Sequence, residues 1–220
     1  MLQTNQLSFS YSKDGQAFHF PDLSLEKGKH LLILGNSGCG KTTFLHLLAG
    51  LLSTKEGEVS LDNTNFSSLS GAQMDTFRAQ HIGIVFQKPH FLKSLTIKEN
   101  LETAQFLAKQ PTDKARIDAL LEKLGISHRK NAKVSELSEG EKQRASIALA
   151  LINKPSLILA DEPTASLDDE NTQEVIELLK QRAAEENASL VIVTHDQRLK
   201  TEFPTQLVLH KLNESTHETL

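Results

Sequence analysis

The first part of the chain alternates between hydrophobic and polar positions. Leu7, Phe9 and Tyr11 are separated by serines, and a second short alternating stretch covers residues 18–25. A period of two residues predicts strands with one buried face. Asp14-Gly15 lies between the two stretches and predicts a turn, so we expect an antiparallel pair of strands here.

Continuous apolar runs replace the alternation further along the chain, at residues 31–34, 157–160 and 190–193. Such runs are typical of strands that are buried on both faces of a parallel sheet. Residues 41–52 and 169–186, which adjoin these runs, have patterns compatible with crossover helices. The predicted class is therefore α/β with a parallel sheet.

Residues 88–153 have a helical pattern and read as an insertion into this α/β arrangement. Apolar side chains recur there at i, i+3, i+4 and i+7, namely at Ile117, Leu120, Leu121 and Leu124. We expect a helix that begins after Thr112 or Asp113 and ends at Gly125, because these residue types favour the two ends of a helix.

A glycine-rich loop joins the run at 31–34 to its helix and fits the pattern G-x-x-x-x-G-K-[ST]. The loop consists of Gly35, Asn36, Ser37, Gly38, Cys39, Gly40, Lys41 and Thr42. Backbone N–H groups and the helix N-terminus in such a loop bind phosphate oxygens. Lys41 is expected to reach the β- and γ-phosphates and Thr42 to bind Mg²⁺, so the sequence predicts a nucleoside triphosphate ligand.

Two carboxylates, Asp161 and Glu162, directly follow the apolar run at 157–160. Ligands of open α/β sheets bind at the carboxyl ends of the strands. We expect Asp161 to hold Mg²⁺, directly or through water, and Glu162 to polarise the water that attacks the nucleotide.

The segment from Leu137 to Arg144 reads LSEGEKQR and resembles the LSGGQ signature of the ABC (ATP-binding cassette) ATPases. It lies upstream of the Asp161 strand at the spacing of that family. Further matches follow in family order: Tyr11 resembles the adenine-stacking aromatic, Gln87 the Q-loop, residues 166–168 the D-loop and His195 the H-loop. The resemblance extends from about Leu7 to His210.

The resemblance implies a P-loop fold with a RecA-like parallel-sheet core, a small antiparallel β-subdomain and an inserted helical subdomain. The expected organisation is a single ABC ATPase domain over 1–220, with the core and its antiparallel part at 1–87 and 154–220. The helical subdomain with the signature motif is expected at 88–153.

Roles at the site are carried over from the same resemblance. Two subunits would sandwich two ATP molecules, each between the P-loop of one chain and the signature of the other. Ser138, Gly140 and Asp168 would then act across the dimer, and Thr43 would contact the α-phosphate. The implied catalytic residues are Lys41, Gln87, Glu162 and His195, and the implied Mg²⁺ ligands are Thr42, Gln87 and Asp161.

The implied function is that of an ATP-hydrolysing subunit which works as a homodimer and powers separate integral membrane subunits of a transporter. It would lie on the cytoplasmic face of the inner (plasma) membrane. Arg78, residues 82–87 and the segment 90–100 are similar to the lipoprotein-releasing, macrolide-exporter and cell-division class. The cargo is not encoded in this chain, because the membrane subunit recognises it.

Composition narrows these possibilities. No run approaches the roughly 18 apolar residues that span a bilayer, so we expect no direct membrane insertion. The net charge of -4 offers no general attraction for nucleic acid. Cys39 is the single cysteine, so an intrachain disulfide is excluded and a reducing cytosol is expected. An accessible Cys39 thiol would make nucleotide binding sensitive to bulky adducts.

Three alternatives remain. A GTPase or small-molecule kinase shares the P-loop, but residues 153–156 lack the aspartate of the NKxD motif. A soluble ABC protein acting on ribosomes or DNA usually has paired cassettes or long insertions, which this chain lacks. A hydrolysis-impaired cassette is suggested by Glu139, which replaces a glycine of the signature and brings a carboxylate toward the partner's triphosphate. The intact Lys41, Asp161, Glu162 and His195 argue against it.

Overall fold

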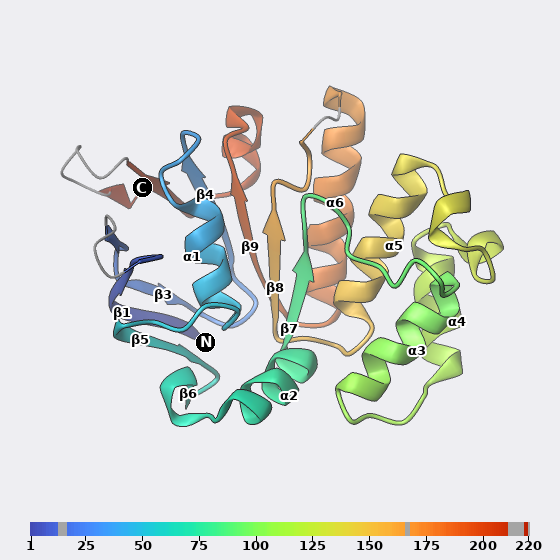
Figure 1. The fold of residues 1–220 in the computed structure, drawn as a ribbon. Helices are drawn as coiled ribbons and strands as arrows, with labels where there is room; N and C mark the ends of the chain where they lie inside the picture. The colour runs from blue at the N-terminus through green and yellow to red at the C-terminus, as the bar shows by residue number, and fades with distance from the viewer. Residues whose placement is uncertain (13–16, 166–167, 211–217, 220) are drawn as a thin grey trace.

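The computed structural model describes residues 1–12, 17–165, 168–210 and 218–219. Its centre is a parallel sheet, drawn upright in Figure 1. In spatial order the parallel strands are β10 (Gln206–Leu209), β4 (His30–Gly35), β9 (Ser189–Thr194), β8 (Leu157–Asp161) and β7 (Ile82–Val85). β11 (Glu218–Thr219) pairs antiparallel with β10. The three predicted apolar runs are therefore the buried strands β4, β8 and β9.

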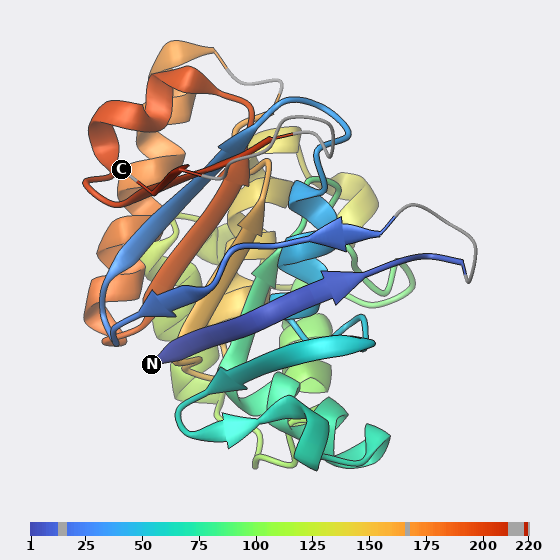
Figure 2. The ribbon, with the colours of Figure 1, turned by 90° about the vertical axis from the view of Figure 1, so that its left-hand side faces the viewer.

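A second, antiparallel sheet is built around β1 (Leu2–Phe9), and Figure 2 shows it facing the viewer. β1 pairs with three strands and β6 extends the sheet from β5; these are β2 (Phe18–His19), β3 (Leu23–Leu25), β5 (Glu56–Leu61) and β6 (Thr64–Asn65). The predicted antiparallel start is confirmed, although the stretch 18–25 forms two strands. Pro21 lies between them and has no N–H for the ladder. The predicted turn at Asp14-Gly15 lies outside the described residues.

Three helices accompany the two sheets: α1 (Lys41–Leu48), α2 (Gly71–His81) and α6 (Asp169–Glu185). The 3-10 turn η1 (Phe66–Ser68) connects β6 to α2, and the 3-10 turn η4 (Gln197–Glu202) connects β9 to β10. The prediction of a helix over 41–52 was too long. The chain leaves α1 at Ala49, and Gly50 adopts a left-handed φ of 62° that ends the helix.

Between β7 and β8 the chain forms α3 (Ile97–Leu107), α4 (Lys114–Lys123) and α5 (Glu139–Leu151), with the 3-10 turns η2 (Ser127–Arg129) and η3 (Val134–Glu136). These helices lie together beyond the β7 edge of the sheet (Figure 1). The predicted helix at 112–125 is confirmed: Asp113 caps α4 and Gly125 follows it with a φ of 69°. Among the described residues, no helix has the length and apolarity needed to cross a membrane.

The two faces of the parallel sheet pack into two different cores. Leu32 and Leu34 of β4 join the core that includes α3, α4, α5 and α6. Leu31 and Ile33 point to the opposite face and join the core of α1 and the antiparallel sheet. This alternation follows from the period of two along a strand. The sheet therefore holds the loop after β4 between two packed layers.

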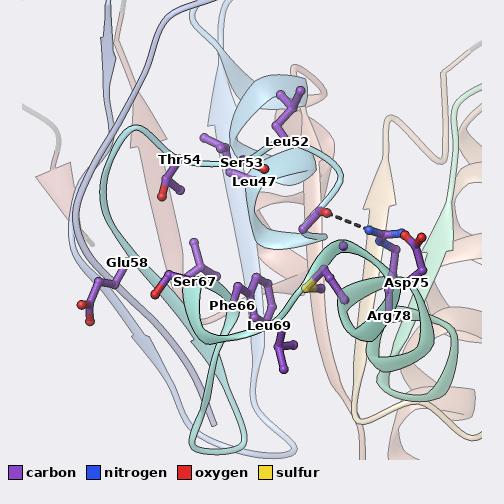
Figure 3. Close-up of a pocket in the computed structure, with 14 residues that line it drawn as sticks. Leu47, Leu52, Ser53, Thr54, Glu58, Phe66, Ser67, Leu69, Asp75 and Arg78 are labelled. Atoms are coloured by element: carbon purple, nitrogen blue, oxygen red, sulfur yellow. Dashed lines mark hydrogen bonds and ion pairs between the residues drawn. The ribbon is translucent and has the colours of Figure 1, made fainter.

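The C-terminal end of α1 is held by a side chain of α2. Arg78 donates from Nε to the carbonyl of Ala49 at 3.0 Å and from Nη2 to the carbonyl of Gly50 at 2.8 Å. Its Nη1 also pairs with Asp75 at 2.9 Å, beside a pocket of about 380 Å³ that Figure 3 shows. A cation at this end complements the helix dipole. Arg78 thus fixes the helix whose other end carries the phosphate-binding loop.

Candidate active site

A pocket of about 670 Å³ opens at the carboxyl ends of the central strands. Its lining consists of Phe18, Asn36, Ser37, Gly38, Gly40, Lys41, Thr42, Thr43, Gln87, Glu162, His195 and Gln197. β4, β8, β9 and β7 end beside it, and these strand ends supply the loop at 35–40, Glu162, His195 and Gln87. The four residues predicted to be catalytic therefore share one pocket.

Backbone conformation shapes the glycine-rich loop. Gly38 and Gly40 adopt φ values of 81° and 100°, which other residues rarely accept. A Cβ atom at Gly40 would lie 2.8 Å from the Phe18 ring. Gly40 is also the N-cap of α1 and makes no side-chain cap, and the first turn of α1 has no acidic residue. The first N–H groups of α1 therefore face the pocket as donors for an anion.

Lys41 folds back over its own loop. Its Nζ donates to the carbonyls of Gly35 at 2.7 Å and Asn36 at 3.2 Å. The same Nζ lies 3.8 Å from Oε1 of Glu162, and the lysine side chain is only 8% exposed. A phosphate that enters the pocket would offer this ammonium group a charged acceptor, which binds more strongly than a carbonyl.

Glu162 is held by the residues at the end of β9. Its Oε2 accepts from Oγ1 of Thr194 at 2.7 Å and from the backbone N–H of His195 at 3.4 Å. Its Oε1 lies 2.9 Å from Nδ1 of His195. Glu162 has a left-handed φ of 46°, a conformation that costs a non-glycine residue roughly 1–3 kcal/mol. Backbone strain of this kind is common at functional sites.

Thr42 and Asp161 lie together beneath the loop. Oγ1 of Thr42 donates to Oδ1 of Asp161 at 3.3 Å. Burial raises the pKa of the Asp161 carboxyl, the negative charge of Glu162 adds to this, and the hydrogen bond from Thr42 opposes it. A buried carboxylate beside a hydroxyl is a set of hard oxygen donors, which suits Mg²⁺. Since Mg²⁺ keeps several waters and takes few protein ligands, the site fits this ion, and Gln87 lines the same pocket as Thr42.

Tyr11 lies beside the loop without lining the pocket. The residue is 67% exposed, and its hydroxyl lies 2.9 Å from Oγ1 of Thr43. Phe18 is the aromatic residue that does line the pocket, packed edge-on against Tyr11 and stacked on Phe20. Phe18 was not predicted as a site residue, because only the pairing of β2 with β1 places it against Gly40.

Ser138, Gly140 and Asp168 do not line the pocket. Ser138 is the N-cap of α5 and Gly140 lies in the first turn of that helix, whereas Asp168 is the N-cap of α6. Asp168 accepts from the backbone N–H of Asn171 at 2.9 Å. Residues 166 and 167 of the D-loop match lie outside the described part of the chain. These candidate ligands are exposed at helix N-termini and are not part of the pocket lining.

Glu141 fixes the start of α5 in a capping box with Ser138. Its Oε2 accepts from the backbone N–H of Ser138 at 2.8 Å, and Oγ of Ser138 accepts from the Glu141 N–H at 3.3 Å. Its Oε1 accepts from Nε of Arg129 at 2.7 Å and lies 3.1 Å from Nε2 of His128. The bond from Arg129 is the main reason that the pKa of Glu141 is lowered to about 2.

Glu139 projects from the first turn of α5 with a 90% exposed side chain. Nζ of Lys142 lies 2.7 Å from its Oε1, so the carboxylate has a cation beside it. Gln143, one turn further, donates to the carbonyl of Pro163 at 3.1 Å. α5 is thus tied directly to the residues that follow Glu162.

Cys39 lies inside the glycine-rich loop and belongs to the buried core of α1 and the antiparallel sheet. Its residue is 6% exposed, and its Sγ packs where a Cβ atom at Gly35 would come within 2.5 Å. The condition of an accessible thiol is therefore not met in this structure. We expect bulky thiol reagents to react slowly with the folded chain.

Comparisons with known proteins agree with this arrangement. The family model described as ABC transporter matches residues 19–165. The chain is 37% identical to the lipoprotein-releasing system ATP-binding protein LolD of Colwellia psychrerythraea over 214 residues, which cover 95% of this chain and 83% of the relative. It is 42% identical to the LolD protein of Saccharophagus degradans over 177 residues, which cover 80% of this chain and 78% of the relative.

Solved structures of the bacterial ABC transporter cassette MJ0796 have the same fold. A dimeric structure superposes with a TM-score of 0.87 at 28% identity and covers 100% of this chain and 99% of its own. A dimeric post-hydrolysis state, bound to ADP and Pi, superposes with a TM-score of 0.86 at the same identity and coverage. The predicted α/β class, with a parallel core, an antiparallel β part and helices, is confirmed.

Proposed function

Since the chain belongs to the ABC transporter family, as an ATP-binding and ATP-hydrolysing subunit, we propose that two copies close around two ATP molecules and drive separate membrane subunits. The observation that carries the proposal is the division of the predicted ligands between two places. Lys41, Gln87, Glu162 and His195 line one pocket, whereas Ser138 and Gly140 lie outside it at the start of α5. A second copy would supply the missing donors to each pocket.

Residues of the pocket, together with Tyr11 beside it, have distinct roles in this proposal. The loop N–H groups and Lys41 bind the β- and γ-phosphates, and Thr43 contacts the α-phosphate. Tyr11 and Phe18 provide the aromatic surface for the adenine. Glu162 polarises the attacking water, a role worth roughly 10²–10⁴-fold in rate. His195, which lies 2.9 Å from Glu162, contacts the γ-phosphate and keeps the carboxylate oriented.

Thr42, Asp161 and Gln87 would hold Mg²⁺. The ion, when bound with ATP, supplies positive charge that offsets the charge developing on the phosphate oxygens. The remaining work falls to the protein: the strained backbone of Glu162 directs its carboxylate toward the pocket, and Lys41 gives up two carbonyl acceptors for the phosphates.

The partner in the proposed assembly is an integral membrane subunit. A groove of about 550 Å³ lies between α2, β7, α3 and α5, and apolar side chains such as Ile84, Phe86, Leu107 and Leu149 line it. Phe106 and Leu107 at the end of α3 are 75% and 63% exposed. Phe86 lines this groove and directly precedes Gln87 of the nucleotide pocket. A cytoplasmic segment of the membrane subunit bound in the groove would therefore be coupled to structural changes at the nucleotide. The proposal places the chain on the cytoplasmic face of the inner membrane.

Two finer statements belong to the same proposal. The transporter is of the lipoprotein-releasing, macrolide-exporter and cell-division class, supported by the identity to LolD proteins. The helical part at 88–153 acts as a subdomain that carries the signature toward the partner, and 1–87 with 154–220 acts as the core. The hydrogen bond from Gln143 to the carbonyl of Pro163 supports this division of the chain, because it lets α5 move together with the residues of the nucleotide pocket.

The solution mass of a Glu162→Gln variant tests the proposed dimer. Without hydrolysis, ATP should hold the two copies together, so light scattering with Mg-ATP is expected to give twice the mass measured without nucleotide. A Glu162→Gln, Lys41→Ala double variant is the control and should stay monomeric. A monomer that binds ATP at saturation would contradict the self-contained dimer. Wild-type protein without ATPase activity would favour the hydrolysis-impaired alternative.

A further inference from the structure

A chain of hydrogen bonds leads from Glu162 away from the nucleotide pocket. Oε2 of Glu162 accepts from Oγ1 of Thr194 at 2.7 Å. The same Oγ1 accepts from the backbone N–H of Asp196 at 3.0 Å. The turn formed by Thr194, His195 and Asp196 is thereby attached to the Glu162 carboxylate at one end. Its other end carries the Asp196 carboxylate, which is 14% exposed.

Arg198 receives this chain of contacts. Its Nε donates to both Asp196 oxygens, at 2.9 and 3.0 Å, and its Nη2 donates to Oδ2 of Asp196 at 2.7 Å. The guanidinium also reaches α6: Nη1 pairs with Asp169, and Nη2 donates to Oγ1 of Thr172 at 3.3 Å. Asp169 and Thr172 belong to the first turn of α6, directly after Asp168.

Charge and burial both stabilise the contacts that Arg198 makes with Asp196 and with α6. The hydrogen bonds with Asp196 and, after them, with Asp169 raise the pKa of Arg198, and the bonds from Arg198 lower the pKa of Asp196. Thr172 is buried, so its hydroxyl gives a fixed anchor on α6. A planar guanidinium can bind two carboxylates at once, which an ammonium group cannot do with the same geometry. Arg198 therefore joins two segments that lie 29 residues apart in the sequence.

We propose that Arg198 is a positioning residue for ATP hydrolysis, which holds the Thr194–Asp196 turn, and through it Glu162 and His195, against the first turn of α6. The inference rests on the proposed roles of Glu162, His195 and Asp168. Asp168 precedes α6 and is proposed to act across the dimer. The contacts of Arg198 would therefore also fix the position of Glu162 and His195 relative to Asp168. Arg198 itself stays outside the nucleotide pocket lining.

The test compares steady-state ATP hydrolysis by four forms of the full chain: wild type, Arg198→Ala, Asp169→Ala and the double variant. A small misplacement of catalytic groups costs up to about 10²-fold in rate, so kcat of Arg198→Ala should fall at least about 10-fold. Equilibrium binding of a non-hydrolysable ATP analogue should change less than about twofold, because no phosphate ligand is removed. Arg198→Lys should recover only part of the rate.

The Asp169 variant separates positioning from stability. Asp169 is 88% exposed, so its removal should leave the fold intact while it removes the charged contact of Arg198 with α6 and keeps the hydrogen bond to Thr172. Its kcat should fall less than that of Arg198→Ala, and the double variant should be no slower than Arg198→Ala alone. Lys123→Ala, which removes an exposed pair with Glu185 at the other end of α6, is the matched control and should hydrolyse ATP as wild type does.

Two results would overturn the proposal. One is a kcat of Arg198→Ala equal to that of wild type. The other is a fall in the kcat of Arg198→Ala that comes with an equal fold loss of ATP affinity and a lower thermal midpoint, while Asp169→Ala hydrolyses ATP as wild type does. Glu162→Gln distinguishes these failures from failure of the proposed function. If Glu162→Gln abolishes hydrolysis while Arg198→Ala is normal, only the Arg198 proposal falls. If Glu162→Gln hydrolyses ATP normally, the proposed site roles fall and the positioning proposal with them.

Discussion

At the scale of single residues, Glu162 contacts the same groups that are proposed to bind the γ-phosphate. Its carboxylate lies near the ammonium of Lys41 and the imidazole of His195, the two groups proposed to contact the γ-phosphate. ATP binding must therefore exchange contacts among charged groups that already lie close together. Such an exchange needs little rearrangement, since the hydrogen-bonding groups stand within one pocket.

Glu139 tests how charge at the signature affects the proposed dimer. We expect Glu139→Gln and Glu139→Gly, in the Glu162→Gln background, to dimerise at lower ATP concentrations than their parent. A carboxylate facing the partner's triphosphate is repelled, and the exposed pair with Lys142 offsets only part of this. Sedimentation across an ATP titration measures the midpoint. Glu122→Gln, on the remote helix α4, is the control, and equal midpoints in all variants would contradict the idea.

The Glu141 carboxylate makes the start of α5 sensitive to acid. Its pKa is lowered to about 2 in the folded chain, below its ordinary value of 4.5, so it stabilises the fold above pH 4.5 and loses this effect as pH falls toward 2. The stability of wild type relative to Glu141→Gln should therefore decrease between about pH 4.5 and 2. Urea unfolding at a series of pH values measures the difference. A pH-independent difference would show that the charge is not what matters.

At the scale of elements, the attachment of α1 to α2 should control how firmly the phosphate-binding loop is held. We expect Arg78→Ala to destabilise the chain by about 2 kcal/mol, since two carbonyls at the helix end lose a charged donor. Chemical denaturation measures the change. Asp75→Asn removes a 73% exposed partner of Arg78 and should cost less than about 1 kcal/mol, so equal costs would contradict the argument.

The elements themselves were largely predictable because their burial is written in periodicity. β4, β8 and β9 carry continuous apolar runs, and α4 has both its cap and its terminating glycine in the sequence. The end of α1 was missed, since residues 49–52 continue the apolar pattern while Arg78 and the conformation of Gly50 stop the helix. Gly50 is itself a local signal for the end of a helix, whereas Arg78 acts from a segment 28 residues away.

At the scale of the whole molecule, site residues that lie within one contiguous motif could be predicted from the sequence, and site residues brought in from distant segments could not. Residues within one motif, such as Gly35 to Thr42, were found because the loop, its strand and its helix are contiguous. Phe18 and Arg198 were not, since they come to the site through the β1–β2 register and the approach of η4 to α6. Side chains that act between segments leave no local pattern.

Among the side chains that act between segments, Arg116 should contribute most to the stability of the fold. It joins α4 of the helical part to α5 and to the residue that follows α6. Its Nη2 donates to the carbonyl of Leu151 at 3.0 Å and to Glu186 at 2.6 Å, with both charged side chains about 15% exposed or less. Arg116→Ala leaves the largely buried Glu186 carboxylate without its cation. We expect the free energy of unfolding to fall by about 3 kcal/mol. Hydrogen exchange should quicken in α4 before it does in β8. Lys123→Ala removes the neighbouring exposed pair with Glu185 and should cost less than about 1 kcal/mol, because water already screens it. If the two variants lost equal stability, the Arg116 guanidinium would contribute no more than an exposed surface contact, and the prediction would be wrong.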